Sequence, residues 1–125
     1  MNLSLSVIVV LHEQETAVAR IVRGALQTAR EALGPDGSLE LIAVDERSGD
    51  NTLSHLSILQ HKLPELRVLE APKRGRGIQV AARVARGKTW IIVDHNVDPK
   101  ILRWGIESLR KGHRAAVVPG EVLVV

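Results

Sequence analysis

Residues 89–99 read TWIIVDHNVDP, and this stretch decides the fold class of the chain. Its first five residues are β-branched or aromatic, as in a buried strand. The strand ends abruptly in the polar residues 94–96 (DHN), after which Asp98 and Pro99 begin a helix. An open α/β sheet presents its ligand site at such carboxyl ends of strands. The stretch therefore predicts an α/β protein with a polar site where this strand ends.

The rest of the chain repeats this alternation of apolar strands with amphipathic helices. Strands are expected at 4–11, 39–44, 66–71, 89–93, 115–118 and 121–125. Helices are expected at 16–33, from just after residue 50 to about residue 61, at 78–86 and at 99–111. Strands joined by helices form a mainly parallel sheet with right-handed crossovers. We expect a three-layer α/β/α fold with a Rossmann-like sheet of five to six strands, in which residues 1–125 form one domain. The third helix is expected to bury Ile78, Ala81, Ala82 and Ala85.

Composition narrows the class of protein. Apolar residues make up 45% of the chain, and the only aromatic residues are two Trp, so the core must consist of Val, Ile, Leu and Ala. The chain has no Cys, which excludes disulfides and thiolate metal sites. Residues 1–15 show no secretory leader pattern, and their apolar run is too short to span a bilayer. We therefore expect a cytoplasmic location and no membrane span.

The charge of the chain is mildly basic and locally concentrated. Lys and Arg number 17 against 14 Asp and Glu, which gives a formal charge of +3. This balance fits a local patch for a phosphate or another anion better than a surface for nucleic acid. The excess lies in two groups, Lys73, Arg74 and Arg76, and then Arg83, Arg86 and Lys88.

Polar clusters follow three of the expected strands, at residues 12–15 (HEQE), 45–46 (DE) and 94–96 (DHN). In a parallel sheet these strand ends lie along one edge, so the clusters can converge. Asp94 and Asn96 offer oxygen ligands for Mg²⁺ or Mn²⁺ bridging a diphosphate. His95 is expected to be a solvated loop residue, and Asp98 a helix cap.

Two further segments have candidate roles. The loop at residues 73–77 (KRGRG) combines cations with glycines beside a helix start, which suits a phosphate, although a solvated basic loop is the equal alternative. Asp45 and Glu46 could bind a ribose or a base edge. No G-x-G-x-x-G follows the first strand, which disfavours a nicotinamide-binding domain, and no G-x-S-x-G marks a serine hydrolase.

Taken in order, these segments resemble the motifs of family 2 glycosyltransferases of the GT-A fold, of the dolichol-phosphate-mannosyltransferase-like kind. Residues 6–15 (SVIVVLHEQE) are similar to the family's apolar strand followed by Pro-x-Tyr-Asn-Glu. Residues 44–52 (VDERSGDNT) resemble its Val-Asp-Asp-Gly-Ser-x-Asp-Gly-Thr. RGRG at 74–77, with the Ala-rich helix and Gly87 after it, resembles Gly-Lys-Gly-x-Ala…Ala-x-Gly, and IIVDHN at 91–96 occupies the place of Asp-x-Asp.

The resemblance implies a UDP- or GDP-linked sugar as donor and a divalent cation, Mg²⁺ or Mn²⁺. It places Asp45 near the base, Asp94 near the ribose or sugar phosphate, and Asn96 at the principal metal-ligand position. The nucleotide-binding residues implied in this way are Glu13, Glu15, Asp45, Glu46, Arg74, Arg76 and Asp94, and the metal ligands are Asp94 and Asn96.

Several positions depart from the family pattern. Val10, His12 and Glu13 replace its Pro, Tyr and Asn, while Glu46 and Arg47 replace its second Asp and the following Gly. Asn96 replaces the last acid of Asp-x-Asp, which should weaken metal binding because an amide contributes no charge. The family's acceptor half, which carries the catalytic base, would follow Val125, so no catalytic residue is assigned here.

We therefore expect a nucleotide-sugar-binding domain that is weakly active or inactive by itself. The alternative is a catalytically dead scaffold or interaction module. The apolar residues 122–125 (VLVV) would form an exposed edge strand, through which the chain would form a homodimer or bind a partner protein.

An unrelated flavodoxin-like domain, such as a response-regulator receiver, is a further alternative. A receiver needs acids after its first strand, an Asp after the third and a Lys after the fifth. Glu13 and Glu15 match loosely, but the third strand ends in residues 71–72 (AP) and the fifth in 118–119 (VP), which disfavours this class.

Overall fold

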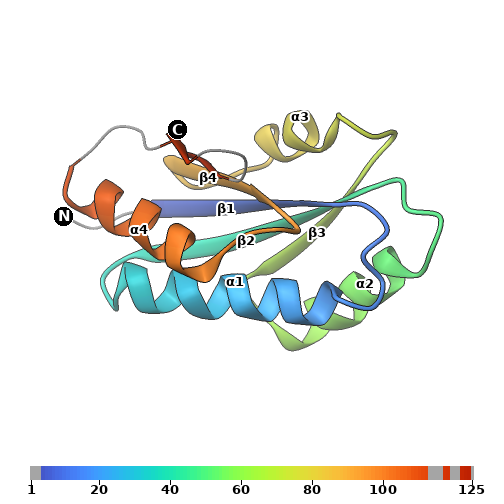
Figure 1. Cartoon of the computed structure of the whole chain (residues 1–125), viewed down its shortest axis with the longest axis horizontal. Helices are drawn as coiled ribbons and strands as arrows, with labels where there is room; N and C mark the ends of the chain where they lie inside the picture. Colours follow the sequence, from blue (N-terminus) through green and yellow to red (C-terminus); the bar gives the residue numbers. More distant parts are fainter. Residues whose placement is uncertain (1–3, 113–116, 119–121, 125) are drawn as a thin grey trace.

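A computed structural model of the chain describes residues 4–112, 117–118 and 122–124. Strands and helices alternate along it, as the sequence predicts (Figure 1). The elements are β1 (Ser4–Leu11), α1 (Val18–Leu33), β2 (Ser38–Glu46), α2 (Thr52–Lys62), β3 (Leu66–Ala71), α3 (Gly77–Ala82), β4 (Thr89–Asp94), α4 (Pro99–Arg110), β5 (Val117–Val118) and β6 (Val122–Val124).

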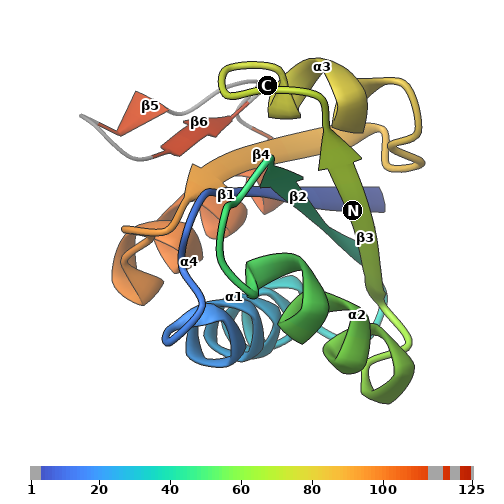
Figure 2. The ribbon, with the colours of Figure 1, turned by 90° about the vertical axis from the view of Figure 1, so that its right-hand side faces the viewer.

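The strands form one sheet in the order β3-β2-β1-β4-β6-β5. The four strands β1 to β4 are parallel, β6 runs antiparallel beside β4, and β5 pairs antiparallel with β6. Helices α1, α2 and α4 lie on one side of the sheet and α3 lies on the other (Figure 2). The predicted α/β class with a mainly parallel sheet is confirmed.

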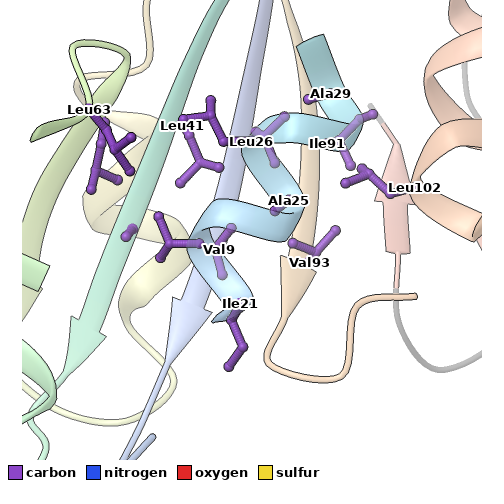
Figure 3. Packing of buried hydrophobic residues seen from close by; sticks show 14 of the residues in the cluster. Val9, Ile21, Ala25, Leu26, Ala29, Leu41, Leu63, Ile91, Val93 and Leu102 are labelled. Atoms are coloured by element: carbon purple, nitrogen blue, oxygen red, sulfur yellow. The ribbon is translucent and has the colours of Figure 1, made fainter. Parts of the chain in front are cut away.

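The larger hydrophobic core lies between the sheet and helices α1, α2 and α4 (Figure 3). Side chains of a strand point alternately to its two faces, and every second residue of β1 enters this core. The predicted apolar face of α1 is buried, because its residues recur at the spacing of a helix. The buried members from β1 and α1 are Leu5, Val7, Val9, Leu11, Val18, Ile21, Val22, Ala25, Leu26, Ala29, Ala32 and Leu33.

The opposite face of the sheet carries a smaller core beneath α3. This helix ends at Ala82, four residues earlier than predicted, and Ile78 is 45% exposed rather than buried. Ala81 is buried as predicted, together with Gly77 one helical turn earlier, while Ala82 and Ala85 are half-buried. Beyond the end of the helix, the backbone amides of Arg86 and Gly87 donate to Glu40 and Ser6 instead of to a carbonyl of a longer helix.

Those amides bind a polar cluster that β1, β2 and β3 share. The Glu40 carboxylate accepts from Ser6 Oγ at 2.6 Å, from Arg67 Nη1 at 2.8 Å and from the Arg86 amide at 2.5 Å. The Ser6 oxygen in turn accepts from the Gly87 amide at 2.8 Å. Desolvation would raise the pKa of Glu40, but these hydrogen bonds together hold it below its ordinary value. The cluster therefore fixes the segment between α3 and β4 against the sheet.

The outer side of β3 is an edge of the sheet, and neighbouring groups satisfy two of its outward amides. Gln60 of α2 accepts from the Val68 amide with its side-chain Oε1 at 2.8 Å. The amide two residues earlier, at Leu66, donates to the Leu63 carbonyl at 3.0 Å. Alternate amides of a strand point the same way, so these two bonds cover consecutive outward donors.

The expected edge strand at residues 122–125 is corrected by the pairings. Val122 pairs with Val93 of β4 on one side and with Val118 of β5 on the other. Val122–Val124 is therefore an interior strand of the sheet, while residue 125 lies outside the described residues. A sequence pattern identifies an apolar strand but does not say which strand will become its neighbour.

Within the described part of the chain, no helix combines the length and the apolar content that crossing a membrane requires.

Candidate functional site

The candidate site lies at the carboxyl ends of β1, β2 and β4, which are neighbours in the sheet. Leu11 of β1 is in register with Asp45 of β2, and Val10 is in register with Asp94 of β4. The two acids thus flank the end of β1, separated by two inter-strand spacings, or about 10 Å. The predicted meeting of polar strand ends at one edge of the sheet is present in the structure, while the alternation of side chains puts Asp45 on the face of Leu41 and Ala43 and Asp94 on the face of Trp90 and Ile92.

Asp45 is 3% exposed, and its carboxylate is held by a local turn. Oδ1 accepts from the Ser48 hydroxyl, and Oδ2 accepts from the Ser48 amide at 3.3 Å. Arg47 between them has a φ of 50°, a left-handed conformation that glycine adopts most easily. The position therefore favours the glycine of the motif that the chain resembles, and Arg47 fills it with the same turn.

The loops after β1 and β2 are joined by hydrogen bonds, and we call residues 12–15 with 47–52 the paired loops. Each of three successive amides in the first loop donates to a side chain of the second, and Glu15 accepts one amide in return. The bonds are Glu13 N to Ser48 Oγ (2.8 Å), Gln14 N to Thr52 Oγ1 (2.9 Å), Glu15 N to Asp50 Oδ2 (3.3 Å) and Asn51 N to Glu15 Oε1 (2.8 Å).

The acids of the paired loops thus have structural partners. The hydroxyl of Thr52 donates to Asp50 at 2.5 Å, and this bond, with the amides of Thr52 and Glu15, lowers the pKa of Asp50 against the opposing effect of desolvation. The Glu13 side chain is exposed, and its Oε2 lies 3.8 Å from His12 Nε2. Of the two glutamates predicted in the first loop, Glu13 is the one that faces solvent.

The basic loop at residues 73–76 (KRGR) differs from the expected phosphate cradle. The amides of Gly75 and Gly77 donate to Oε2 of Glu46, at 3.0 and 2.7 Å. An internal carboxylate therefore occupies the place beside the glycines that was predicted for a phosphate. The side chains of Lys73, Arg74 and Arg76 are exposed, and Arg76 also donates to Gln79 at 2.7 Å.

Glu46 also contacts the first loop through its backbone. Its carbonyl lies 2.7 Å from Nδ1 of His12, and because a carbonyl only accepts, this nitrogen carries the proton. Ser48 and Thr52 were not predicted as site residues, and His12 was predicted only as a member of the polar cluster at residues 12–15. Ser48 follows Asp45 by three residues, a local turn pattern that could have indicated it, whereas the contact of His12 depends on strand pairing.

At the end of β4, Asp94 is half-buried, while His95 and Asn96 are exposed. Oδ1 of Asp94 accepts from the Asn96 amide at 2.8 Å. Asp98 accepts from the Lys100 amide at 2.8 Å with Pro99 as the first helical residue, so it is the helix cap that the sequence predicts. Among the described residues, no group of three His, Asp or Glu is placed to hold a metal.

Two cavities lie near the ends of the sheet. One of about 280 Å³ is beside the candidate site, between α1 and the start of α4, with His95 and Arg20 in its lining. The other, of about 400 Å³, is at the opposite edge of the strands and includes Glu40 and Arg67. The larger cavity is therefore distant from the strand ends that carry Asp45 and Asp94, and its Glu40 and Arg67 are paired with each other.

Residues 6–120 match the sequence pattern of Glycosyl transferase family 2. The chain belongs to this family. A relative is dolichyl-phosphate beta-glucosyltransferase ALG5C from Trichomonas vaginalis, 30% identical in an alignment 99 residues long that covers 73% of this chain and 29% of the relative. The chain thus spans less than a third of the length of this relative.

Solved structures agree with the family's fold. The mannosyltransferase PcManGT from Pyrobaculum calidifontis, in complex with GDP-Man and Mn²⁺, superposes with a TM-score of 0.71 at 20% identity, over 87% of this chain and 33% of that one. S. aureus TarS in complex with UDP-GlcNAc gives 0.65 at 22% identity, over 92% and 32%. At these identities the likeness shows the fold, and this family 2 chain has the GT-A type of sheet.

Proposed function

We propose that this family 2 chain binds a nucleotide-diphosphate sugar, UDP- or GDP-linked, at the carboxyl ends of β1, β2 and β4. The observation that supports the proposal is the placement of Asp45 and Asp94 on either side of β1. The base would lie toward Asp45 and Glu13, and the diphosphate toward Asp94 with Arg74 and Arg76. The structural relatives include complexes with GDP-Man and with UDP-GlcNAc.

A divalent cation, Mg²⁺ or Mn²⁺, would be held by Asp94 and Asn96 together with the diphosphate. These cations commonly take one or two carboxylates plus phosphate oxygens, so one carboxylate and one amide oxygen are sufficient for a weak site. The cation would neutralise charge on the diphosphate. Asn96 contributes no charge, so we propose that metal affinity is lower than in a site with two acids.

We propose that the chain is weakly active or inactive by itself. Transfer of a hexose needs a base positioned on the acceptor. The acids around the site, Asp45, Glu46, Asp50 and Asp94, each accept hydrogen bonds from neighbouring groups of the fold. This engagement supports a role in holding the donor more than a role in proton transfer.

We also propose that the chain is located in the cytoplasm, with which its lack of Cys agrees.

The alternative function is a scaffold that has kept the fold, associating as a homodimer or with a partner protein. Asn96 in place of an acid favours it. Because Val122–Val124 lies between β4 and β5, its removal would open the sheet rather than remove an interface. A chain that binds no nucleotide and whose sedimentation depends on concentration would support the scaffold.

Calorimetric titration of UDP- and GDP-sugars, with and without Mn²⁺, tests the donor site. Asp94→Ala is expected to weaken Mn²⁺-dependent binding roughly tenfold to a hundredfold, because contacts of a charged group contribute about 1.5–3 kcal/mol. Asp36→Ala is the matched control, since this exposed acid lies in the turn between α1 and β2. Failure of every nucleotide sugar to bind at millimolar concentration would contradict the donor site.

Asn96→Asp is expected to raise the affinity for Mn²⁺ in the presence of UDP by roughly tenfold, because it adds a charged ligand to an exposed position. The measurement is a Mn²⁺ titration at fixed UDP. Asn51→Asp is a suitable control, since it adds the same charge to an exposed residue of the paired loops. An unchanged Mn²⁺ affinity in Asn96→Asp would mean that this residue does not face the cation.

A further inference from the structure

Glu46 is a buried residue, 7% exposed, and it joins two loops of the site. Its carboxylate binds the basic loop through the amides of Gly75 and Gly77, and its carbonyl binds His12 of the paired loops. A carboxylate that accepts two backbone amides is held in a fixed position. Little of this group is accessible to a ligand.

The packing around Gly77 shows how closely the basic loop is seated. A Cβ added at Gly77 would lie 2.9 Å from Oε2 of Glu46 and 3.1 Å from Cγ1 of Val10. Both distances are shorter than normal contacts. The loop therefore rests directly on Glu46 and on the end of β1.

This seating sets the position of the basic side chains relative to the proposed diphosphate site. Val10, which Gly77 contacts, is in register with Asp94 on β4. The loop that carries Lys73, Arg74 and Arg76 thus ends beside Val10 of β1, and Asp94 is on the neighbouring strand β4. Without its anchor to Glu46, the loop would lose the contacts that hold it there.

We propose that Glu46 is a positioning residue, which holds the basic loop over the diphosphate and does not itself touch the nucleotide. The inference rests on the proposed donor site. The inference predicts that removing the negative charge of Glu46 lowers the affinity for a diphosphate. Removing a negative charge near a diphosphate should by Coulomb's law strengthen binding, whereas loss of the loop's anchor should weaken it.

The test compares Glu46→Ala with the unmodified chain, using UDP or GDP, whichever that chain binds, and the corresponding nucleoside. Because alanine leaves the amides of Gly75 and Gly77 without their acceptor, Glu46→Ala is expected to weaken binding of the diphosphate roughly tenfold, as for loss of one charge-assisted hydrogen bond, and to leave nucleoside binding unchanged. Amide hydrogen exchange at Gly75 and Gly77 should accelerate in the same variant. Glu70→Gln, which removes an exposed acid from β3, is expected to leave both measurements unchanged or to strengthen diphosphate binding slightly.

Gly77→Ala provides a second variant that keeps Glu46 and displaces the loop sterically, and it should weaken diphosphate binding in the same direction. Diphosphate affinity that is unchanged or raised in Glu46→Ala, or an equal loss for nucleoside and diphosphate, would overturn the inference. If the unmodified chain binds neither UDP nor GDP, the proposed function fails and this inference fails with it. If the unmodified chain binds UDP or GDP and the variants at Glu46 and Gly77 bind it equally well, the inference about Glu46 is wrong while the proposed function stands.

Discussion

Gly87→Ala is expected to lower the free energy of unfolding by about 3 kcal/mol, the upper range for overpacking a closed site. A Cβ at this position would lie 2.5 Å from the Ser6 amide nitrogen, 2.6 Å from Ser6 Oγ and 2.8 Å from the Leu5 carbonyl carbon. Two of these atoms belong to the backbone of β1, in the middle of the sheet, and cannot move without breaking strand pairs. Urea denaturation of the variant and the unmodified chain measures the difference.

Gly24→Ala is the matched control for this substitution. Gly24 is inside α1 and has open space around the added Cβ, so alanine should raise the free energy of unfolding by about 0.5–1 kcal/mol through helix propensity. A Gly87→Ala protein as stable as the unmodified chain would show that the segment before β4 does not approach β1 as described.

Glu40→Ala is expected to lower the free energy of unfolding by about 3 kcal/mol, because it leaves the partners of a largely buried carboxylate without an acceptor. The Glu40 side chain is 12% exposed, and it binds Ser6, Arg67 and the Arg86 amide. Glu31→Ala removes an acid that is 50% exposed and paired with Arg103, so it should change stability far less. Equal effects of the two substitutions would contradict the role of the cluster.

The lowered pKa of Glu40 makes the free energy of unfolding depend on pH. The pKa of Glu40 is lowered in the folded chain, so its contribution is complete above the ordinary glutamate pKa of 4.5 and is lost as pH falls through the lower, folded pKa. Glu40→Gln should therefore lose less stability than the unmodified chain when denaturation is compared at neutral pH and below pH 4.5. An unchanged pH profile in Glu40→Gln would show that this group does not titrate with unfolding.

Much of the fold could be predicted from the sequence because its signals are local. Continuous apolar runs mark β1 and β4, whose strands are covered on both faces, and the spacing from Val18 to Leu33 marks the buried side of α1. The start of α4 was predicted from the pair Asp98 and Pro99, a helix cap followed by a first helical proline. Alternation of strands and helices then leaves few arrangements of the sheet.

The parts that the sequence did not predict depend on contacts between distant residues. Glu46 is separated from Gly75 and Gly77 by 29 and 31 residues, and no local pattern shows that a strand-end acid will bind a later glycine loop. The early end of α3 has the same origin, since Glu40 and Ser6 hold the segment that follows. Asp45 with Ser48 is the opposite case, a contact across three residues.

The bond between Gln60 and the Val68 amide has a consequence for how copies of this chain meet at high concentration. An uncovered edge strand is a template for aggregation, because its unpaired amides can donate hydrogen bonds to a strand of another molecule. On β3, a helix side chain and a loop carbonyl already satisfy two consecutive outward amides, and the exposed charge of Glu70 follows them. Sheet growth from this side would have to break those bonds and bury that charge, so β3 acts as a built-in stop against self-templated assembly.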